Sequence, residues 1–214
     1  MLFILALTAS LFSSHADQNK LKTYSAAKKV FWKKLYTSND NRSLYCNESF
    51  ERRNGMNIEH VFAASWMKRP AGCKNGNRGA CRRKSERFNR MEADLHNLHP
   101  TRTRVNSARG SKFFAEIEAP TYSTACPIEI DDREVEPADF SKGKVARSVL
   151  YMQHEYNVNL DKLGNGAGFE RMLLKWHCQH PPTANEVARN NKIFRIQNTN
   201  NPFVLGEFDC SSIN

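Results

Sequence analysis

The spacing of apolar residues along the chain predicts several amphipathic helices. In Leu21–Tyr36, apolar residues recur at helical intervals with lysines between them, which predicts a helix that packs one face on the core. The segment from Ser85 to Pro100 has the same spacing, and Pro100 closes it because proline cannot continue a helix. The same periodicity predicts three further helices, at Pro137–Tyr156, Phe169–His177 and Ala184–Gln197.

A second pattern, with strand-forming residues on both sides of a turn signal, predicts a small sheet. The turn signal is Asn54-Gly55, so we expect a β-hairpin whose second arm carries Glu59 and His60. Further along, "TRTRVNSARGS" predicts a short helix or ordered turn that carries Asn106. Together the patterns predict a single α+β domain, mostly helical, with a small sheet.

The first sixteen residues, "MLFILALTASLFSSHA", predict a secretory signal peptide. They hold an apolar run without acidic or basic side chains and end in Ser14-His15-Ala16, a small-x-small cleavage site. The run is too short for a membrane span, which needs about 20 residues, so we expect no membrane association. Residues 17–214 are enough for one compact domain. We therefore expect a monomer in the periplasm or outside the cell, without an obligate protein partner.

Six cysteines follow the predicted cleavage site. An even number in an exported chain favours disulfide bonds, and three bridges fit this number. The connectivity stays open, except that Cys73 and Cys81 are expected to clip the short loop between them. The cluster His177-Cys178-His180 also suggests a zinc site, but an exported thiol more often pairs with another thiol.

Basic residues are numerous and unevenly distributed. The chain has 32 lysines and arginines against 22 acidic residues, a formal net charge of +10, which implies a polyanionic partner such as nucleic acid. Nine basic residues and one acid lie between Lys68 and Arg90, whereas the acidic segment Ile128–Phe140 is expected to face away from the polyanion. The residues expected to contact nucleic acid are Lys74, Arg82, Arg83, Arg102, Arg104 and Arg109.

Glu59 and His60 interrupt an apolar run, "NIEHVFAASWM". Buried ionisable groups cost free energy unless each has a partner. A carboxylate that binds a hard divalent cation and an imidazole that takes a proton from water would give both residues a role. Neighbouring side chains of a regular strand point to opposite faces, so this hypothesis requires a bulge or a strand end near Ala63. The alternative is an ordinary hydrogen-bonded interior pair, and spacing alone does not decide between the two.

Two further residues complete this hypothesis. Magnesium takes one or two protein carboxylates and keeps water and phosphate as its other ligands, so the amide oxygen of Asn106 is a fitting second ligand. Cleavage of a phosphodiester gathers negative charge on nonbridging oxygens, which calls for a guanidinium, and Arg78 in the loop between Cys73 and Cys81 is the candidate. With His60 as general base, activity should fall as the pH drops through its pKa, about 6.5 if unperturbed.

The stretches "NIEHVFAASWM" and "MEADLHNLHPTRTRVNSARG" resemble the endonuclease I family of bacterial periplasmic and secreted nucleases. Further matches lie in "GKVARSVLYM" and "IFRIQNTNNPFV", so the resemblance covers nearly all of residues 17–214 in order. It implies a ββα-metal (His-Me finger) fold and a magnesium-dependent endonuclease that cleaves DNA, often also RNA, with little sequence preference. The implied ends are 5′-phosphate and 3′-hydroxyl, and Mn²⁺ or Ca²⁺ are alternative metals.

Carried over position by position, the resemblance implies a role for each candidate residue. His60 matches the general base, and Glu59 and Asn106 match the two metal ligands. Arg78 matches the residue that stabilises the cleaved phosphate, and Glu92 matches a supporting position near the site.

Two alternatives from other classes stay open. The first is a basic, disulfide-bonded nucleic-acid-binding protein on the same fold without catalysis. The second is a zinc hydrolase that uses His60 with His96 and His99, whose spacing of three suits ligands on a helix. Four aromatic residues could also stack on bases, although such residues more often belong to the core: Trp66, Trp176, Phe113 and Phe114.

Overall fold

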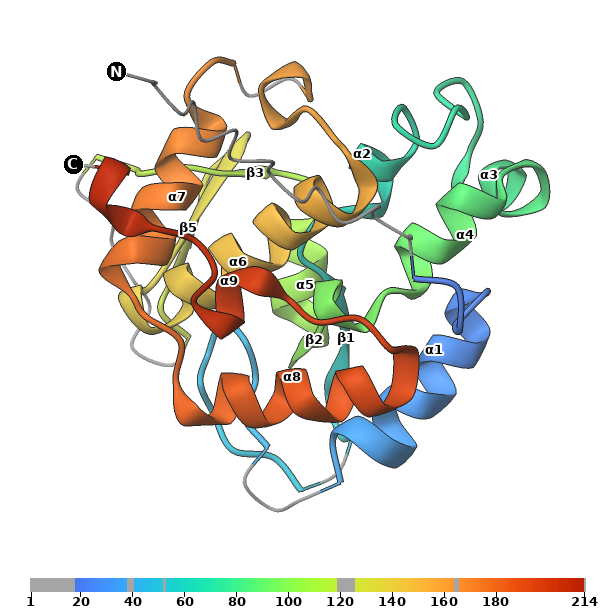
Figure 1. The fold of residues 1–214 in the computed structure, drawn as a ribbon, viewed down its shortest axis with the longest axis horizontal. Helices are drawn as coiled ribbons and strands as arrows, with labels where there is room; N and C mark the ends of the chain where they lie inside the picture. Colours follow the sequence, from blue (N-terminus) through green and yellow to red (C-terminus); the bar gives the residue numbers. More distant parts are fainter. Residues whose placement is uncertain (1–17, 38–40, 52, 119–125, 164–165, 214) are drawn as a thin grey trace, which may run out of the picture.

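The computed structural model describes residues 18–37, 41–51, 53–118, 126–163 and 166–213. The predicted signal peptide, residues 1–16, lies outside them. Helices dominate and two small sheets accompany them, so the fold is α+β and mostly helical, as predicted (Figure 1). Among the described residues, no helix has both the length and the hydropathy that a membrane span requires.

Most helices begin at a side chain that caps their free backbone N–H groups. The α-helices are α1 (Tyr24–Val30), α2 (Ala64–Met67), α3 (Arg78–Lys84), α4 (Glu86–Ala93), α5 (Thr103–Arg109), α6 (Asp139–Tyr156), α7 (Phe169–Gln179), α8 (Ala184–Gln197) and α9 (Pro202–Leu205). The shorter helical turns are η1 (Phe31–Leu35), η2 (Leu95–Asn97), η3 (Leu160–Lys162) and η4 (Cys210–Ile213). Thr23, Asn77 and Ser85 cap α1, α3 and α4. Thr183 and Glu186 form a capping box at α8.

Four of the predicted helices are present with small changes at their ends. The first is α1 extended by the π-helical turn η1, and α8 has the predicted bounds. Helix α6 begins two residues later than predicted, and α7 ends two residues later. The predicted short helix that carries Asn106 is α5.

The helix predicted from Ser85 to Pro100 is wrong in its C-terminal half. Helix α4 ends at Ala93, and the chain continues through η2 into the strand β2 (Leu98–Arg102). The side chain of Asp94 accepts a hydrogen bond from His96 N, which starts a new turn in place of a continued helix. Apolar spacing cannot reveal this break. Leu95 and Leu98 are buried in the structure, as they would be on the inner face of a continued helix.

The predicted β-hairpin is wrong in its pairing. Asn54-Gly55 does form a turn, with Gly55 at a φ of +69°. Among the described residues before it, residues 41–51 and 53, the only β pairing is an isolated bridge between Arg42 and Ser49. Strand β1 (Met56–His60) pairs instead with β2, antiparallel, and α5 follows β2 and packs on both strands. A turn signal shows where the chain reverses, whereas the partner of a strand depends on long-range packing.

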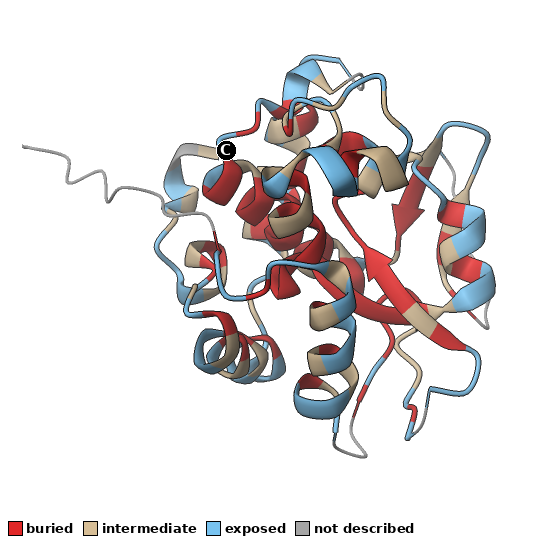
Figure 2. Ribbon diagram, turned by 90° about the vertical axis from the view of Figure 1, so that its right-hand side faces the viewer, coloured by how far each residue is buried: buried red, intermediate tan, exposed pale blue. Residues whose placement is uncertain are grey.

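The second sheet contains β3 (Phe113–Phe114), β4 (Ile128–Ile130) and β5 (Glu134–Pro137), in the order β3-β5-β4. The core lies around α6, which packs along α7 and is surrounded by the other elements (Figure 1). Buried residues accordingly line the inner faces of the helices, and exposed residues cover their outer faces (Figure 2). Trp66, Trp176 and Phe114 are buried, and Phe113 stacks on Trp66, so these aromatic residues belong to the core.

Three disulfide bonds join the six cysteines in pairs. They join Cys46 to Cys126, Cys73 to Cys81, and Cys178 to Cys210, so the predicted bridge around Arg78 is present. Because Cys178 is bonded to Cys210, its thiolate cannot serve the zinc site considered for that cluster.

We expect the disulfide bonds to stabilise the fold in the order of the loops that they close. Cys46 and Cys126 are 80 residues apart, and Cys73 and Cys81 are 8 apart. Loop entropy in the unfolded chain then predicts losses of about 4.5 and about 2.5 kcal/mol in the free energy of unfolding when each pair is replaced by alanine. Denaturant unfolding of the two double variants measures these losses. A larger loss for the short loop would contradict the prediction.

Candidate active site

One cavity brings together four residues that the sequence analysis selected. It has a volume of about 650 Å³ and is lined by Glu59 and His60 of β1, Arg78 of α3 and Asn106 of α5, among others. These elements are far apart in the sequence. Asn106 reaches the cavity because α5 packs on the β1-β2 pair, and α3, which carries Arg78, packs on α4. Glu92 of α4 lies behind the cavity and does not line it.

The strand end that the hypothesis requires is present, and it falls at His60. After His60 the chain leaves the strand, and Asn97 holds the turn: its Oδ1 accepts a hydrogen bond from Phe62 N and its Nδ2 donates to Phe62 O. Glu59 and His60 keep different neighbours, as expected for consecutive residues, yet both line the same cavity.

Glu59 is buried, and two side chains bind its carboxylate, to which the backbone N–H of His60 also donates. The hydroxyl of Tyr45 donates to its Oε1 at 2.7 Å, and Nη1 of Arg109 lies 3.2 Å from the same oxygen. Neither contact uses Oε2. Burial raises the pKa of Glu59, and Arg109 and Tyr45 oppose this effect. A buried carboxylate with one oxygen free of these contacts is suited to bind a cation.

His60 is buried in a way that fixes its tautomer. Its Nε2 lies 3.0 Å from the backbone carbonyl oxygen of Glu92. A carbonyl oxygen only accepts hydrogen bonds, so Nε2 carries the proton and Nδ1 is the basic nitrogen. The ring also packs against Tyr24, with centroids 4.9 Å apart.

The pKa of His60 is lower than that of a free histidine. Burial, followed by the positive charge of Arg78, lowers it from 6.5 to about 4. The imidazole is therefore neutral over a wider pH range than the sequence analysis assumed. The acid limb expected at about 6.5 moves down, because that value holds only for an unperturbed histidine.

The amide of Asn106 is oriented by its neighbours. Its Nδ2 donates to Asn57 Oδ1 at 2.8 Å and to the carbonyl oxygen of Ile58 at 3.1 Å. Two acceptors that hold the nitrogen leave Oδ1 as the free end of the amide. Glu59 and Asn106 thus offer oxygen donors to one cavity, and hard oxygen donors of this kind fit a magnesium ion.

Glu92 connects the basic helix α3 to the cavity wall. Its buried carboxylate accepts a hydrogen bond from Nε of Arg78 and is also bound by Nε of Arg82, at 2.7 Å. Burial raises the pKa of Glu92, but the hydrogen bonds from Arg82 and Arg78 outweigh this and lower it. Because its backbone carbonyl also holds His60, Glu92 fixes the positions of two residues that line the cavity.

Arg109 does not belong to the nucleic-acid surface for which it was predicted. It is fully buried, and its guanidinium donates to the carbonyl oxygens of His60 and Val61 at 3.0 and 2.8 Å. The same group lies over the rings of Trp66 and Phe114. Helical periodicity could have predicted that Arg109 points toward the cavity side of α5. It follows Asn106 by three residues, and residues three apart lie on the same face of a helix.

The other residues predicted to bind nucleic acid lie nearer the surface. Lys74, Arg83 and Arg104 are exposed. Arg102 is partly exposed and binds Glu48, with 2.6 Å between its Nε and Oε1. Arg82 is exposed although it binds Glu92. These five remain candidates for contact with a polyanion.

His96 and His99 do not join His60 in the cavity. Nε2 of His96 lies 3.0 Å from Thr199 O, and Nε2 of His99 lies 3.0 Å from Ser148 Oγ. Both are buried and neither lines the cavity, which argues against the zinc hydrolase alternative.

Three residues that shape the cavity were not predicted from the sequence: Tyr24, Tyr45 and Asn57. Tyr45 binds Glu59, Asn57 binds Asn106, and Tyr24 packs on His60. Asn57 lies two residues before Glu59, so strand alternation places both on one face. No local pattern marks Tyr24 or Tyr45, because their contacts depend on how α1 and the segment before β1 pack.

We expect the imidazole of His60 to titrate with a midpoint near 4 instead of 6.5. The measurement is the pH dependence of its Cε1–H resonance in metal-free protein, assigned by comparison with His60→Gln. Arg78→Gln should raise the midpoint because it removes a nearby positive charge. Arg83→Gln, an exposed change on the same helix, should leave it unchanged. A midpoint near 6.5 in the unaltered protein would contradict the burial argument.

We expect Arg109→Met to lower the free energy of unfolding by about 3 kcal/mol or more, because it leaves Glu59 and two carbonyl groups without their partner. Arg104→Met is the matched control on the same helix, and its exposed side chain should change stability by less than about 0.5 kcal/mol. Denaturant unfolding compares the two. Equal effects would show that Arg109 does not hold the site together.

Comparison with known proteins agrees with these observations. A model of the family Endonuclease I matches residues 6–206. The chain is 30% identical to an extracellular deoxyribonuclease of Aeromonas hydrophila over 92% of this chain and 94% of that protein. It is 28% identical to endonuclease-1 of Buchnera aphidicola over 90% of this chain and 79% of that protein. An extracellular ribonuclease of Bacillus subtilis is 33% identical over 75% of this chain and 57% of its own length. The chain therefore belongs to the endonuclease I family, and it is a nuclease.

Proposed function

We propose that this nuclease is a magnesium-dependent endonuclease that hydrolyses DNA with little sequence preference and leaves 5′-phosphate and 3′-hydroxyl ends. RNA is a further substrate in this proposal, because relatives include proteins named deoxyribonucleases and a protein named ribonuclease. Mn²⁺ and Ca²⁺ are the alternative metals.

The orientation of Asn106 is the observation that carries the proposal. An amide in the interior could present either end, and here both partners hold its nitrogen. Its oxygen and the carboxylate of Glu59 would hold the metal. Bound there, magnesium would neutralise the charge that develops on the leaving oxygen.

The reaction also needs a base and a group that stabilises the phosphate. Nδ1 of His60 takes the proton from water, whose oxygen attacks phosphorus, and the hydrogen bond from Nε2 to Glu92 O keeps the ring in position. Arg78 lines the cavity, and its guanidinium stabilises the charge on the nonbridging oxygens. Glu92 positions both residues without contacting the substrate.

The expected binding mode relies on the phosphate backbone. Exposed basic residues of α3 and α5 lie near the cavity, and the sequence contains no element typical of base readout in a groove. Contacts to the backbone give salt-sensitive affinity and weak base preference. The names of relatives, extracellular and periplasmic, support export of this chain as well.

We expect His60→Ala and Asn106→Ala each to reduce the cleavage of plasmid DNA by about 10² to 10⁴-fold, because each removes one part of the catalytic arrangement. A chelator should abolish cleavage, and added Mg²⁺ should restore it. DNA ligase should reseal the nicks without prior end repair, since it needs 5′-phosphate and 3′-hydroxyl ends.

His154→Ala is the matched control, because this exposed histidine of α6 does not line the cavity. It should retain full activity, and both inactive variants should still bind DNA in the presence of chelator. Retarded but intact plasmid under every condition would instead indicate a protein that binds DNA without cleaving it.

A further inference from the structure

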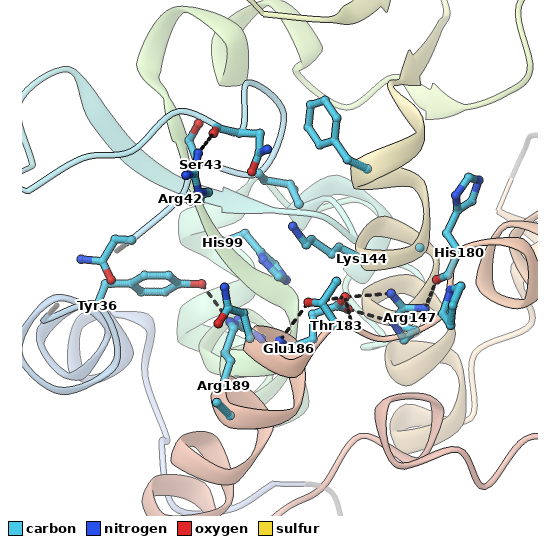
Figure 3. A pocket seen from close by; sticks show the side chains of 18 of the residues that line it. Tyr36, Arg42, Ser43, His99, Lys144, Arg147, His180, Thr183, Glu186 and Arg189 are labelled. Carbon is cyan, nitrogen blue, oxygen red and sulfur yellow. Dashed lines mark hydrogen bonds and ion pairs between the residues drawn. The ribbon is translucent and has the colours of Figure 1, made fainter. Parts of the chain in front are cut away.

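A second cavity is bordered by α6, α8 and residues within 35–36 and 41–47 (Figure 3). Its volume is about 740 Å³, within the range of small-molecule sites, roughly 300 to 1,000 Å³. None of the described residues lines both this cavity and the candidate active site. The two are close all the same, because His99 of the second cavity is the strand partner of Glu59.

The wall of this second cavity is positively charged. Two carboxylates, Asp139 and Glu186, face five cationic side chains, and both carboxylates are already used in ion pairs. Glu186 binds Arg147, with 2.8 Å between Oε1 and Nε, and Asp139 binds Lys142, with 3.0 Å between Oδ1 and Nζ. The cationic side chains are Arg42, Lys144, Arg147, Arg189 and Lys192.

Lys144 is a partly buried cation of this wall without a direct partner among the described residues. It extends from α6 into the cavity between Arg42 and Arg147 (Figure 3). Within the described part of the chain, its ammonium group forms no hydrogen bond and no ion pair. Burial lowers the pKa of Lys144; Glu186 opposes this, and the charges of Arg147, Arg189 and Arg42 lower it further. Holding these cations together costs free energy, which a bound anion would offset.

Two arginines of the cavity, Arg189 and Arg42, are held in place by neutral partners. Arg189 donates to Tyr36 Oη at 2.8 Å and to the carbonyl oxygens of Leu95 and Leu98. Arg42 donates to the carbonyl oxygen of Asn47 at 2.8 Å. These contacts fix the guanidinium groups without neutralising them. A multiply charged anion fits several fixed cations better than a single carboxylate does.

The cavity also has an aromatic ring beside its cationic side chains. Phe140 lines the cavity and is 41% exposed, unusual for a large apolar side chain. An exposed aromatic ring beside cationic groups can stack on a nucleobase while they hold its phosphate.

We propose that this second cavity binds a nucleotide through its phosphate group, with Lys144 as the central cation and Phe140 as the surface for the base. The site goes beyond the proposed function, because it uses none of the residues of the candidate active site. The phosphate can belong to a mononucleotide or to the end of a strand, and the chemistry of recognition is the same.

The test is titration calorimetry of the full chain in chelator, so that no turnover occurs. The probes are inorganic phosphate, a nucleoside 5′-monophosphate, the corresponding nucleoside and a short 5′-phosphorylated oligonucleotide. We expect Lys144→Gln to weaken the binding of the monophosphate by about tenfold or more. Lys175→Gln, an exposed change of the same charge on α7, is the matched control and should bind like the unaltered protein. Phe140→Ala should weaken the monophosphate but not inorganic phosphate.

The outcomes distinguish a free mononucleotide from the end of a strand, and this cavity from the candidate active site. Binding of the monophosphate that depends on Lys144 indicates a free nucleotide, and binding of only the oligonucleotide that depends on Lys144 indicates a strand end. The absence of saturable binding, or binding that Lys144→Gln leaves unchanged, would overturn the proposal. Arg42→Gln tests the same wall if Lys144→Gln does not fold. Plasmid cleavage by Lys144→Gln should stay at the level of the unaltered protein, so a failure here leaves the active-site proposal intact.

Discussion

The guanidinium of Arg109 makes the contacts on which the candidate active site depends. It joins α5 to the end of β1 through two backbone carbonyl groups and pairs with Glu59 in a part of the protein that water does not reach. Such a pair contributes little net stability, but the loss of one partner leaves a buried charge uncompensated. The position of Asn106 follows from the same contact, since it lies one turn earlier on α5. A single buried cation therefore sets the distance between the two elements that carry the oxygen donors.

This arrangement requires that several ionisable groups keep one protonation state. His60, His96 and His99 are all buried beside positive charges or apolar groups, and burial is the first cause of the lowered pKa of each. Each is bonded through Nε2 to a carbonyl or hydroxyl oxygen, so all three can remain neutral in the interior. The structure thus avoids buried positive charge on histidine and keeps it on arginine, which has neutral acceptors or carboxylates around it.

The sequence was sufficient for most helices and for the identities of the four residues that share the cavity. Helical periodicity is a local property, and α8 with its capping box has all of its signals within the helix itself. The pairing of β1 with β2 was beyond this reasoning, because the choice of partner depends on which buried faces meet. Arg109 was assigned to the surface for a related reason: composition counts charges, but only packing distinguishes a solvated arginine from one enclosed by Trp66 and Phe114. The resemblance implied roles for Glu59, His60 and Asn106, and the contacts of Tyr45 and Asn57 explain how the side chains of Glu59 and Asn106 are held.

The positive charge of Arg78 bears on a problem that a histidine faces when it acts as general base in phosphodiester cleavage. A polyanion raises the pKa of a nearby histidine, since the phosphate charge stabilises the imidazolium, and a histidine with an ordinary pKa would then be protonated near neutral pH. In this protein, burial and Arg78 bring the pKa of His60 to about 4 before any substrate arrives. Arg78 is held beside the cavity by Glu92, which also fixes the ring of His60 through its backbone. In the proposed mechanism, Arg78 would both attract the phosphate and, together with burial, keep His60 neutral. Its hydrogen bond to Glu92 links both effects to the geometry of α4.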